Sequence, residues 1–118
     1  MKTYSPLRYP GGKSVLANLL AQIRQLNRLG DRSLAEPFAG GAGASLALLF
    51  QERVPEIYIN DVDLAIHDFW HSLVNDTESF LRLLSRKRVS MAEWRRQREI
   101  YRSTRPVCVG PVTRPGHA

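Results

Sequence analysis

The chain has 118 residues, a formal net charge of +6, 43% hydrophobic residues and 24% charged residues. This composition is typical of a soluble globular protein, and the length leaves room for one small domain. No apolar run approaches the roughly 20 residues that span a bilayer, and the N-terminus lacks the apolar core of a secretory signal, so we expect a cytoplasmic protein with no membrane partner. The single cysteine, Cys108, excludes an internal disulfide framework and a cysteine-based metal cluster.

The first predicted element is an amphipathic helix over residues 14–29. Its apolar side chains recur at spacings of three and four, which places them on one helix face. The members of this face are Leu16, Leu19, Leu20, Ile23 and Leu26. Gly30 follows, and glycine is a residue at which helices stop.

The next segment predicts a strand, a glycine-rich turn, a helix and a second strand. The first strand covers residues 33–37, the turn 38–43, the helix 44–53 and the second strand 57–59, which ends in an acidic turn at 60–63. A strand–helix–strand unit with a glycine turn after its first strand begins a parallel, doubly wound α/β sheet. Two strands are too few for a stable open sheet of this kind, so we expect further strands from elsewhere in the protein or from a partner.

Three helices are predicted after this unit. The first begins at Leu64, the second is capped by Asp76, and the third begins at a Ser-x-x-Glu capping box at residues 90–93 and continues to Tyr101. Residues 103–118 contain three prolines and two glycines without periodicity, so we expect no stable structure there.

The charge is unevenly distributed along the chain. Residues 1–80 carry 7 Lys and Arg against 9 Asp and Glu, whereas residues 81–118 carry 10 against 2. The last third therefore has a net charge of +8, and such a block attracts the phosphate backbone of nucleic acids. A solvated helix face or a tail without a partner would have the same composition, and charge alone does not choose between these interpretations.

The glycine turn and the acidic turn together indicate a ligand site. Glycines have no Cβ, so a ligand can approach the backbone closely beside the N-terminus of the following helix. Asp61 lies 20 residues after Gly41, the separation at which dinucleotide folds place an acid that accepts hydrogen bonds from ribose hydroxyls. The spacing favours a nucleoside-type ligand, and a tight turn without a ligand is the alternative.

Two common nucleotide-binding motifs are excluded. The glycines do not match the dinucleotide fingerprint, because Leu46 stands where a small residue must let the helix pack on the strand. The Gly-Gly-Lys-Ser sequence at residues 11–14 is similar to part of a phosphate-binding P-loop. However, Leu7 stands where that motif requires glycine, and no adequate strand precedes it. We therefore expect no NTPase.

Three motifs in chain order resemble the D12 class of adenine-N6 DNA methyltransferases, the Dam-like group that includes orphan and restriction–modification enzymes. They are Pro-Leu-Arg-Tyr-Pro-Gly-Gly-Lys at residues 6–13, Glu-Pro-Phe-Ala-Gly-Gly-Ala-Gly-Ala-Ser at 36–45 and Asn-Asp-Val-Asp at 60–63. The resemblance covers roughly residues 5–101. It implies a Rossmann-like methyltransferase fold that binds S-adenosyl-L-methionine (SAM), incomplete in this chain.

The resemblance assigns residues to the SAM site. In the family an aromatic residue and a lysine flank the first glycine pair and contact the cofactor, and Tyr9 and Lys13 match them. The second motif forms the loop under the methionine part, and the acid after the second strand, matched by Asp61, binds the ribose. Gly41 stands where some members have alanine. The implied cofactor-binding residues are Tyr9, Lys13, Glu36, Phe38, Gly40, Gly41, Gly43 and Asp61.

The resemblance also divides the chain. It implies a SAM-binding part at residues 5–63, the start of a basic helical target-recognition region at 64–102, and a tail at 103–118 that does not match the family. Family members methylate an adenine that is flipped out of duplex DNA and held by an Asp/Asn-Pro-Pro-Tyr/Phe motif. No Pro-Pro pair occurs in this sequence, so no catalytic residue is assigned.

Three hypotheses follow. In the first, the chain is a truncated adenine methyltransferase that holds much of the SAM site and is inactive alone. In the second, it is a non-catalytic DNA-binding or regulatory fragment that acts through its basic segment. In the third, it is one half of a split enzyme, and a missing C-terminal half supplies the catalytic motif. Double-stranded DNA is the expected partner. His67 and His71 are four residues apart, but no third ligand is nearby, so no metal site is predicted.

Overall fold

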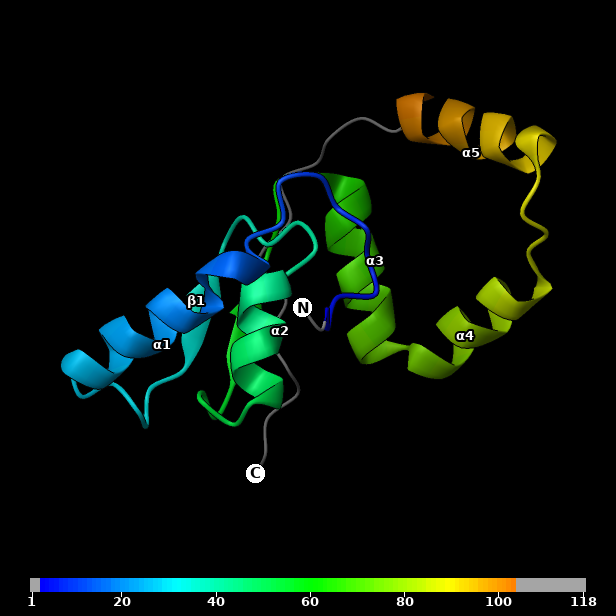
Figure 1. Cartoon of the computed structure of the whole chain (residues 1–118). Helices are drawn as coiled ribbons and strands as arrows, with labels where there is room; N and C mark the ends of the chain where they lie inside the picture. The colour runs from blue at the N-terminus through cyan, green and yellow to red at the C-terminus, as the bar shows by residue number, and fades with distance from the viewer. Residues whose placement is uncertain (1–2, 104–118) are drawn as a thin grey trace. The chain divides into compact units, whose positions relative to one another are not determined.

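The structure, a computed structural model, describes residues 3–103. These residues form two compact units, residues 3–61 and residues 62–103, which hold the elements η1, α1, β1, α2 and β2 and the helices α3, α4 and α5, respectively (Figure 1). The predicted unstructured tail, with Cys108, lies outside the described residues, except for Ser103, which ends the last helix. Within the part of the chain that the structure describes, every helix is too short or too polar to span a bilayer.

The first helical region of unit 1 is shorter than predicted. It consists of a 3-10 turn, η1 (Ser14–Leu16), followed by α1 (Ala17–Leu26). Arg28 adopts a left-handed conformation with a φ of 53°, and the amide of Leu29 donates a hydrogen bond back to the carbonyl of Arg24 at 2.9 Å. This hydrogen bond closes the helix in the manner of a Schellman motif, two residues before the predicted glycine stop.

The apolar face identified in the sequence is only partly buried: its Leu20 packs against the core cluster, whereas other members are exposed. Leu19 and Leu26 on that face are 52% and 83% exposed. Ala17, Ala21 and Arg24 are buried instead, and the two alanines belong to the core cluster that α1 shares with α2. Small side chains allow the two helices to approach closely, whereas no described element of this unit covers the exposed leucines.

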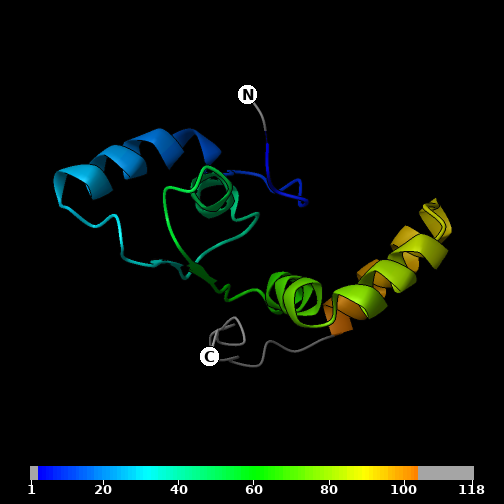
Figure 2. The same cartoon turned by 90° about the horizontal axis from the view of Figure 1, so that it is seen from below.

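The predicted strand–helix–strand unit is confirmed. β1 (Leu34–Glu36) and β2 (Ile57–Ile59) pair in parallel, with Leu34 opposite Ile57, and α2 (Gly43–Phe50) connects them. Figure 2 shows α1 and α2 on the same side of this strand pair. A two-stranded parallel sheet with a helical connection is compatible with an incomplete α/β fold of the predicted class.

Helix α2 supplies the centre of the unit's core. It ends at Phe50 rather than at the predicted residue 53, because Glu52 is left-handed (φ 56°) and the amide of Arg53 donates to the carbonyl of Leu48 at 2.9 Å. The side chain of Leu48 is fully buried. The buried hydrophobic cluster comprises Ala17, Ala21, Ala47, Leu48 and Val54.

Unit 2 contains the three predicted helices, α3 (Leu64–Asn75), α4 (Thr77–Arg86) and α5 (Met91–Ser103). At the start of α3, the side chain of Asp63 accepts a hydrogen bond from the amide of Ala65 at 2.9 Å. Helix α3 buries two side chains, whereas α4 and α5 bury none of their described residues. Helices α4 and α5 therefore add no fully buried side chain to this unit.

The predicted cap at Asp76 is only partly right. Asp76 does precede α4, but its side chain makes no capping hydrogen bond. Its amide donates to the carbonyl of Ser72 at the end of α3, and its carbonyl accepts from the amide of Phe80. Because Asp76 ends one helix while it begins the next, its backbone (φ −140°, ψ 53°) does not adopt the extended conformation of a usual N-cap.

Candidate functional site

The glycine turn and the acidic turn meet at the carboxyl ends of the two strands. The amide of Ala39 donates to the carbonyl of Asn60 at 2.9 Å, and the amide of Gly40 donates to Asp61 Oδ2 at 2.8 Å. Parallel strands end at the same edge of a sheet, so a loop after β1 and an acid after β2 become neighbours. The structure therefore brings together the two features whose spacing suggested a ligand site.

Asn60 also lies at this edge, although it is not among the eight predicted site residues. The side-chain oxygen Oδ1 of Asn60 is buried and accepts no hydrogen bond within the described residues. A buried acceptor without a donor is costly, and such atoms are often completed by a ligand or by water. The sequence motif contained Asn60, but no pattern distinguished it from the acids that follow it.

A second cluster links the N-terminal segment to the end of β1. Lys13 Nζ donates a hydrogen bond to the carbonyl of Phe38 at 2.7 Å and lies 3.0 Å from Glu36 Oε1. The other carboxylate oxygen of Glu36 accepts a hydrogen bond from the hydroxyl of the buried Ser45. The Glu36 side chain is 12% exposed and that of Lys13 is 40% exposed. Phe38 contributes its carbonyl, while its residue as a whole is largely exposed.

The glycines of the turn admit the chain's own N-terminal segment. Gly40 has a φ of +50°, and a Cβ at this position would lie 2.7 Å from Cε1 of the Tyr9 ring. A Cβ at Gly41 would lie 3.1 Å from the Tyr9 Cβ, and one at Gly43 would collide with the Ser14 hydroxyl. The sequence interpretation assigned these glycines to the approach of a ligand. In the structure, the close approach is made by the N-terminal segment, residues 5–14.

A cavity of about 490 Å³ lies between the N-terminal segment and the glycine turn. Tyr9, Gly41 and Gly43 are among its lining residues, together with Arg8 and Gly12. The eight predicted site residues therefore fall into three neighbouring groups within unit 1. They are the lining of this cavity (Tyr9, Gly41, Gly43), the Lys13–Glu36–Phe38 cluster, and the Gly40–Asp61 pair.

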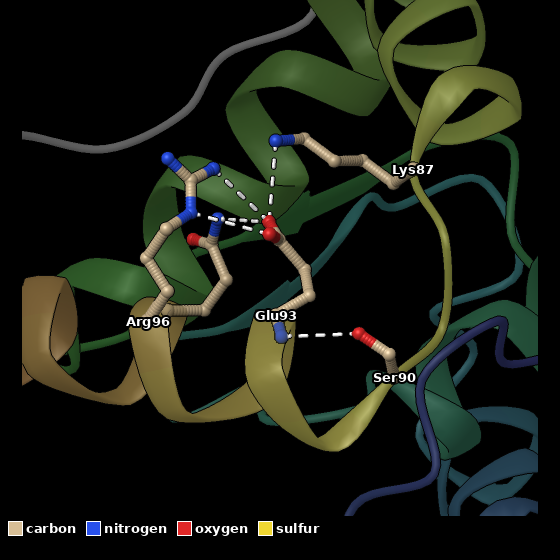
Figure 3. A network of polar contacts seen from close by, with 5 residues as sticks. Lys87, Ser90, Glu93 and Arg96 are labelled. Atoms are coloured by element: carbon tan, nitrogen blue, oxygen red, sulfur yellow. Dashed lines mark hydrogen bonds and ion pairs between the residues drawn. The ribbon is translucent and has the colours of Figure 1, made fainter.

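In unit 2, the start of α5 is held by a polar network around Glu93 (Figure 3). The predicted capping box is half formed: Ser90 Oγ accepts from the amide of Glu93 at 3.1 Å. The Glu93 carboxylate accepts hydrogen bonds from Arg96, Gln97 and Lys87 instead of closing the box. These hydrogen bonds lower the pKa of Glu93 from 4.5 to about 2, and the bond from Arg96 has the largest effect. The contact between Glu93 and Arg96 also raises the pKa of Arg96.

The rest of the basic segment is mostly exposed. Residues 81–103 carry 8 Lys and Arg against 2 Asp and Glu. The guanidinium carbon of Arg98 lies 5.2 Å from the centre of the Trp94 ring, which is within cation–π range. Helix α5 therefore presents a positive surface with two exposed aromatic side chains, Trp94 and Tyr101, a combination suited to nucleic acid.

Comparison with known protein families identifies the chain. The family model described as D12 class N6 adenine-specific DNA methyltransferase matches residues 9–107, and this range includes all eight predicted site residues. No curated protein and no solved structure gives a significant match. A match over most of the sequence shows family membership. The chain belongs to the D12 class of N6 adenine-specific DNA methyltransferases.

Proposed function

We propose that unit 1 binds SAM, and that the chain is the cofactor-binding part of a site-specific DNA adenine-N6 methyltransferase that does not transfer methyl groups on its own. The observation that carries this proposal is the hydrogen bond of 2.8 Å between the Gly40 amide and Asp61. It supports the proposal because it joins the glycine turn after β1 to the acid after β2, where α/β folds bind nucleosides.

The polar groups of unit 1 suit the polar parts of SAM. Asp61 is an acceptor for ribose hydroxyls, while the Glu36 carboxylate and the Phe38 carbonyl are acceptors for an ammonium group. The ring of Tyr9, beside the glycine turn, offers an aromatic face to a cation. When bound, SAM supplies a methyl group on a positively charged sulfur. The role of the residues of unit 1 is to bind SAM and to orient it.

Methyl transfer requires more than these groups. The acceptor is an adenine amino group, which the family holds with a Pro-Pro motif after flipping the base from the duplex. No Pro-Pro pair occurs among the 118 residues. We therefore propose that transfer depends on a second segment or chain that carries this motif.

DNA binding through α5 is the second candidate function. It is favoured by the excess of arginine over acidic residues in residues 81–103. Such binding would weaken steeply with salt, because phosphate contacts release counterions. A mobility-shift titration at two salt concentrations measures this. Salt-dependent binding that is indifferent to SAM would favour a DNA-binding fragment over a cofactor-dependent enzyme.

Titration calorimetry with S-adenosylhomocysteine (SAH), the demethylated product, tests cofactor binding. We expect saturable binding to the 118-residue chain, weakened roughly tenfold or more by Asp61→Ala, because a hydrogen bond to a charged group contributes about 1.5–3 kcal/mol. Asp31→Ala is the matched control, since Asp31 is an acid of the same unit whose side chain is 82% exposed. Absence of binding by the folded wild-type chain would overturn the proposal. Labelled SAM with duplex DNA should give no methylated product.

A further inference from the structure

We propose that the groove between α4 and α5 is a docking site for an acidic amphipathic helix of a partner protein. The groove encloses a cavity of about 410 Å³, and all of its lining residues lie within the stretch 80–97 of unit 2. The inference goes beyond the proposed function, because it concerns helices outside the cofactor site and depends on neither SAM nor DNA. We call this surface the α4–α5 groove.

Two helix faces form the walls of the α4–α5 groove. Residues 80, 83, 84 and 87 line it from the side of α4, and residues 90, 93, 94 and 97 line it from the side of α5. Spacings of three and four place each set on one face of its helix. A groove between two such faces can accept the apolar stripe of a third helix, whose anchors recur at the same spacings.

The floor of the groove is apolar and open to solvent. Leu83, Leu84 and Trp94 line the cavity, and they are 58%, 60% and 53% exposed. Phe80 is partly buried, because its ring packs edge-on against Phe69 of α3 with the ring centres 5.5 Å apart. Exposed apolar side chains that gather in one groove mark a surface for a partner, since an apolar stripe that covers them releases water.

A polar network holds the two walls together. Lys87, which follows α4, donates to Glu93 Oε1 on α5 at 3.2 Å, and Figure 3 shows it reaching across to the carboxylate. Arg96 and Gln97 donate to the same oxygen. The acidic side chain of Glu93 is thus paired with two cations, Lys87 and Arg96, and leaves no net negative charge in the groove. A preformed groove binds at a lower cost than one that must be ordered.

The positive charge around the groove selects the partner. Arg88 lines the groove and is exposed, and the guanidinium carbon of Arg98 lies 5.2 Å from the centre of the Trp94 ring. Within residues 3–103, neither arginine forms an ion pair. A helix with carboxylates on both sides of its apolar stripe complements these cations, whereas a basic helix is repelled.

The same charge argues against other parts of this protein as the occupant. A second copy of the chain would bring a further net charge of +6, and its exposed leucines lie on α1, which contains no acidic residue. Residues 104–118 contain two arginines and no acid. Neither source supplies the carboxylates that the groove complements, so the occupant is a different protein segment.

Duplex DNA fits the groove less well than a helix does. Phosphate groups gain from cations and water, and the apolar floor offers them neither. Arg95 and Arg102 are seven residues apart, so they share a face of α5, and neither lines the groove. DNA contact through α5 can therefore use that face and leave the groove to a protein helix.

The experiment titrates the 118-residue chain with three synthetic peptides of about five helical turns each. The first has leucines on one face and glutamates on both flanks, and the second has lysine in place of each glutamate. The third has the composition of the first in an order that breaks the stripe. Trp94 reports binding by its fluorescence, because Trp70, the other tryptophan, is buried. We expect a saturable blue shift with the acidic peptide, bound on the order of tenfold more tightly than the lysine peptide, and none with the third.

Three variants locate the binding. Leu84→Ala should weaken the acidic peptide on the order of tenfold, because it removes apolar surface from the groove. Leu26→Ala is the matched control, since Leu26 is an exposed leucine of unit 1, and this variant should bind like wild type. Arg88→Glu should weaken the acidic peptide and strengthen the lysine peptide. Circular dichroism checks that each variant is folded, and Leu83→Ala replaces Leu84→Ala if that variant is not.

Several results would overturn the proposal without touching SAM binding. The folded wild-type chain could fail to bind the acidic peptide, or bind it no better than the lysine peptide, or Leu84→Ala could bind it like Leu26→Ala. Duplex DNA binding that Leu84→Ala weakens tenfold or more would assign the groove to nucleic acid instead. A dimer in sedimentation that Leu84→Ala dissociates would assign it to a second copy of the chain.

Discussion

The two units, residues 3–61 and residues 62–103, differ in how far they bury their apolar side chains. In the first unit, two helices and two strands enclose a cluster that includes the fully buried Leu48. In the second, α4 and α5 bury none of their described residues, and Leu84 and Trp94 are 60% and 53% exposed. The unit with a core also contains the eight predicted cofactor residues, whereas the positive excess lies in the last part of the other unit, where residues 81–103 carry 8 Lys and Arg against 2 Asp and Glu. Fixed geometry is needed for a small-molecule site, while phosphate contacts tolerate a looser frame.

The largest expected effect comes from truncating the core of the first unit. Leu48→Ala should lower the free energy of unfolding by about 2–5 kcal/mol, because it removes a buried side chain and leaves a cavity. Leu84→Ala, on the exposed surface of α4, should stay within about 0.5 kcal/mol. Urea unfolding followed by circular dichroism measures both. Equal losses of unfolding free energy in the two variants would show that the first unit does not depend more than the second on buried apolar side chains.

A smaller effect is expected at the glycine turn. Gly40→Ala would force a Cβ into the Tyr9 ring at a φ of +50°, which should cost about 1–3 kcal/mol of stability. Gly30→Ala is the control, because a Cβ there meets nothing within 4 Å and the φ is not positive. That change should be neutral or stabilise by about 0.4–1 kcal/mol, since alanine reduces the entropy of the unfolded chain. A Gly40→Ala variant as stable as the wild-type chain would mean that Tyr9 does not pack on the turn.

The smallest expected effect is a loss of stability at the start of α5 in acid. The pKa of Glu93 is lowered from 4.5 to about 2 in the folded chain. The stabilisation that ionised Glu93 gives to the start of α5 is therefore complete above pH 4.5 and is lost as the pH falls towards 2. Because the network lies in solvent, the gain is small and sensitive to salt. Helicity at 222 nm between pH 5 and pH 2, compared with Glu93→Gln, measures it. A variant with the same pH profile as wild type would contradict the assignment to Glu93.

Much of unit 1 could be predicted because local patterns and parallel topology determine it. The strand–helix–strand order follows from local apolar patterns, and the meeting of Gly40 with Asp61 follows from two parallel strands that end at one edge. Helix α1 shows where local patterns fail. Its leucines fit a buried face by periodicity, but the buried apolar positions are Ala17 and Ala21, and of the leucines only Leu20 packs against their cluster. Which positions are buried depends on the neighbouring element, which periodicity does not identify.

Contacts between distant segments could not be predicted from pattern. Lys13 and Phe38 are 25 residues apart, and no periodicity links them. The family resemblance implies that Lys13 contacts the cofactor, but the contact of its ammonium group with Glu36 could not be derived from the sequence. The packing of Tyr9 on Gly40 is of the same kind, because a glycine in a turn does not reveal which side chain it makes room for.

We propose that the cofactor site lies in residues 3–61 and uses the three motifs together. The most direct test of this proposal is a ¹H–¹⁵N NMR titration of the chain with SAH. The account predicts that the largest amide shifts occur at residues 9–13, 36–43 and 60–61, while amides of residues 77–103 in α4 and α5 change little. Saturable shifts concentrated in residues 77–103, with residues 36–43 unaffected, would contradict it.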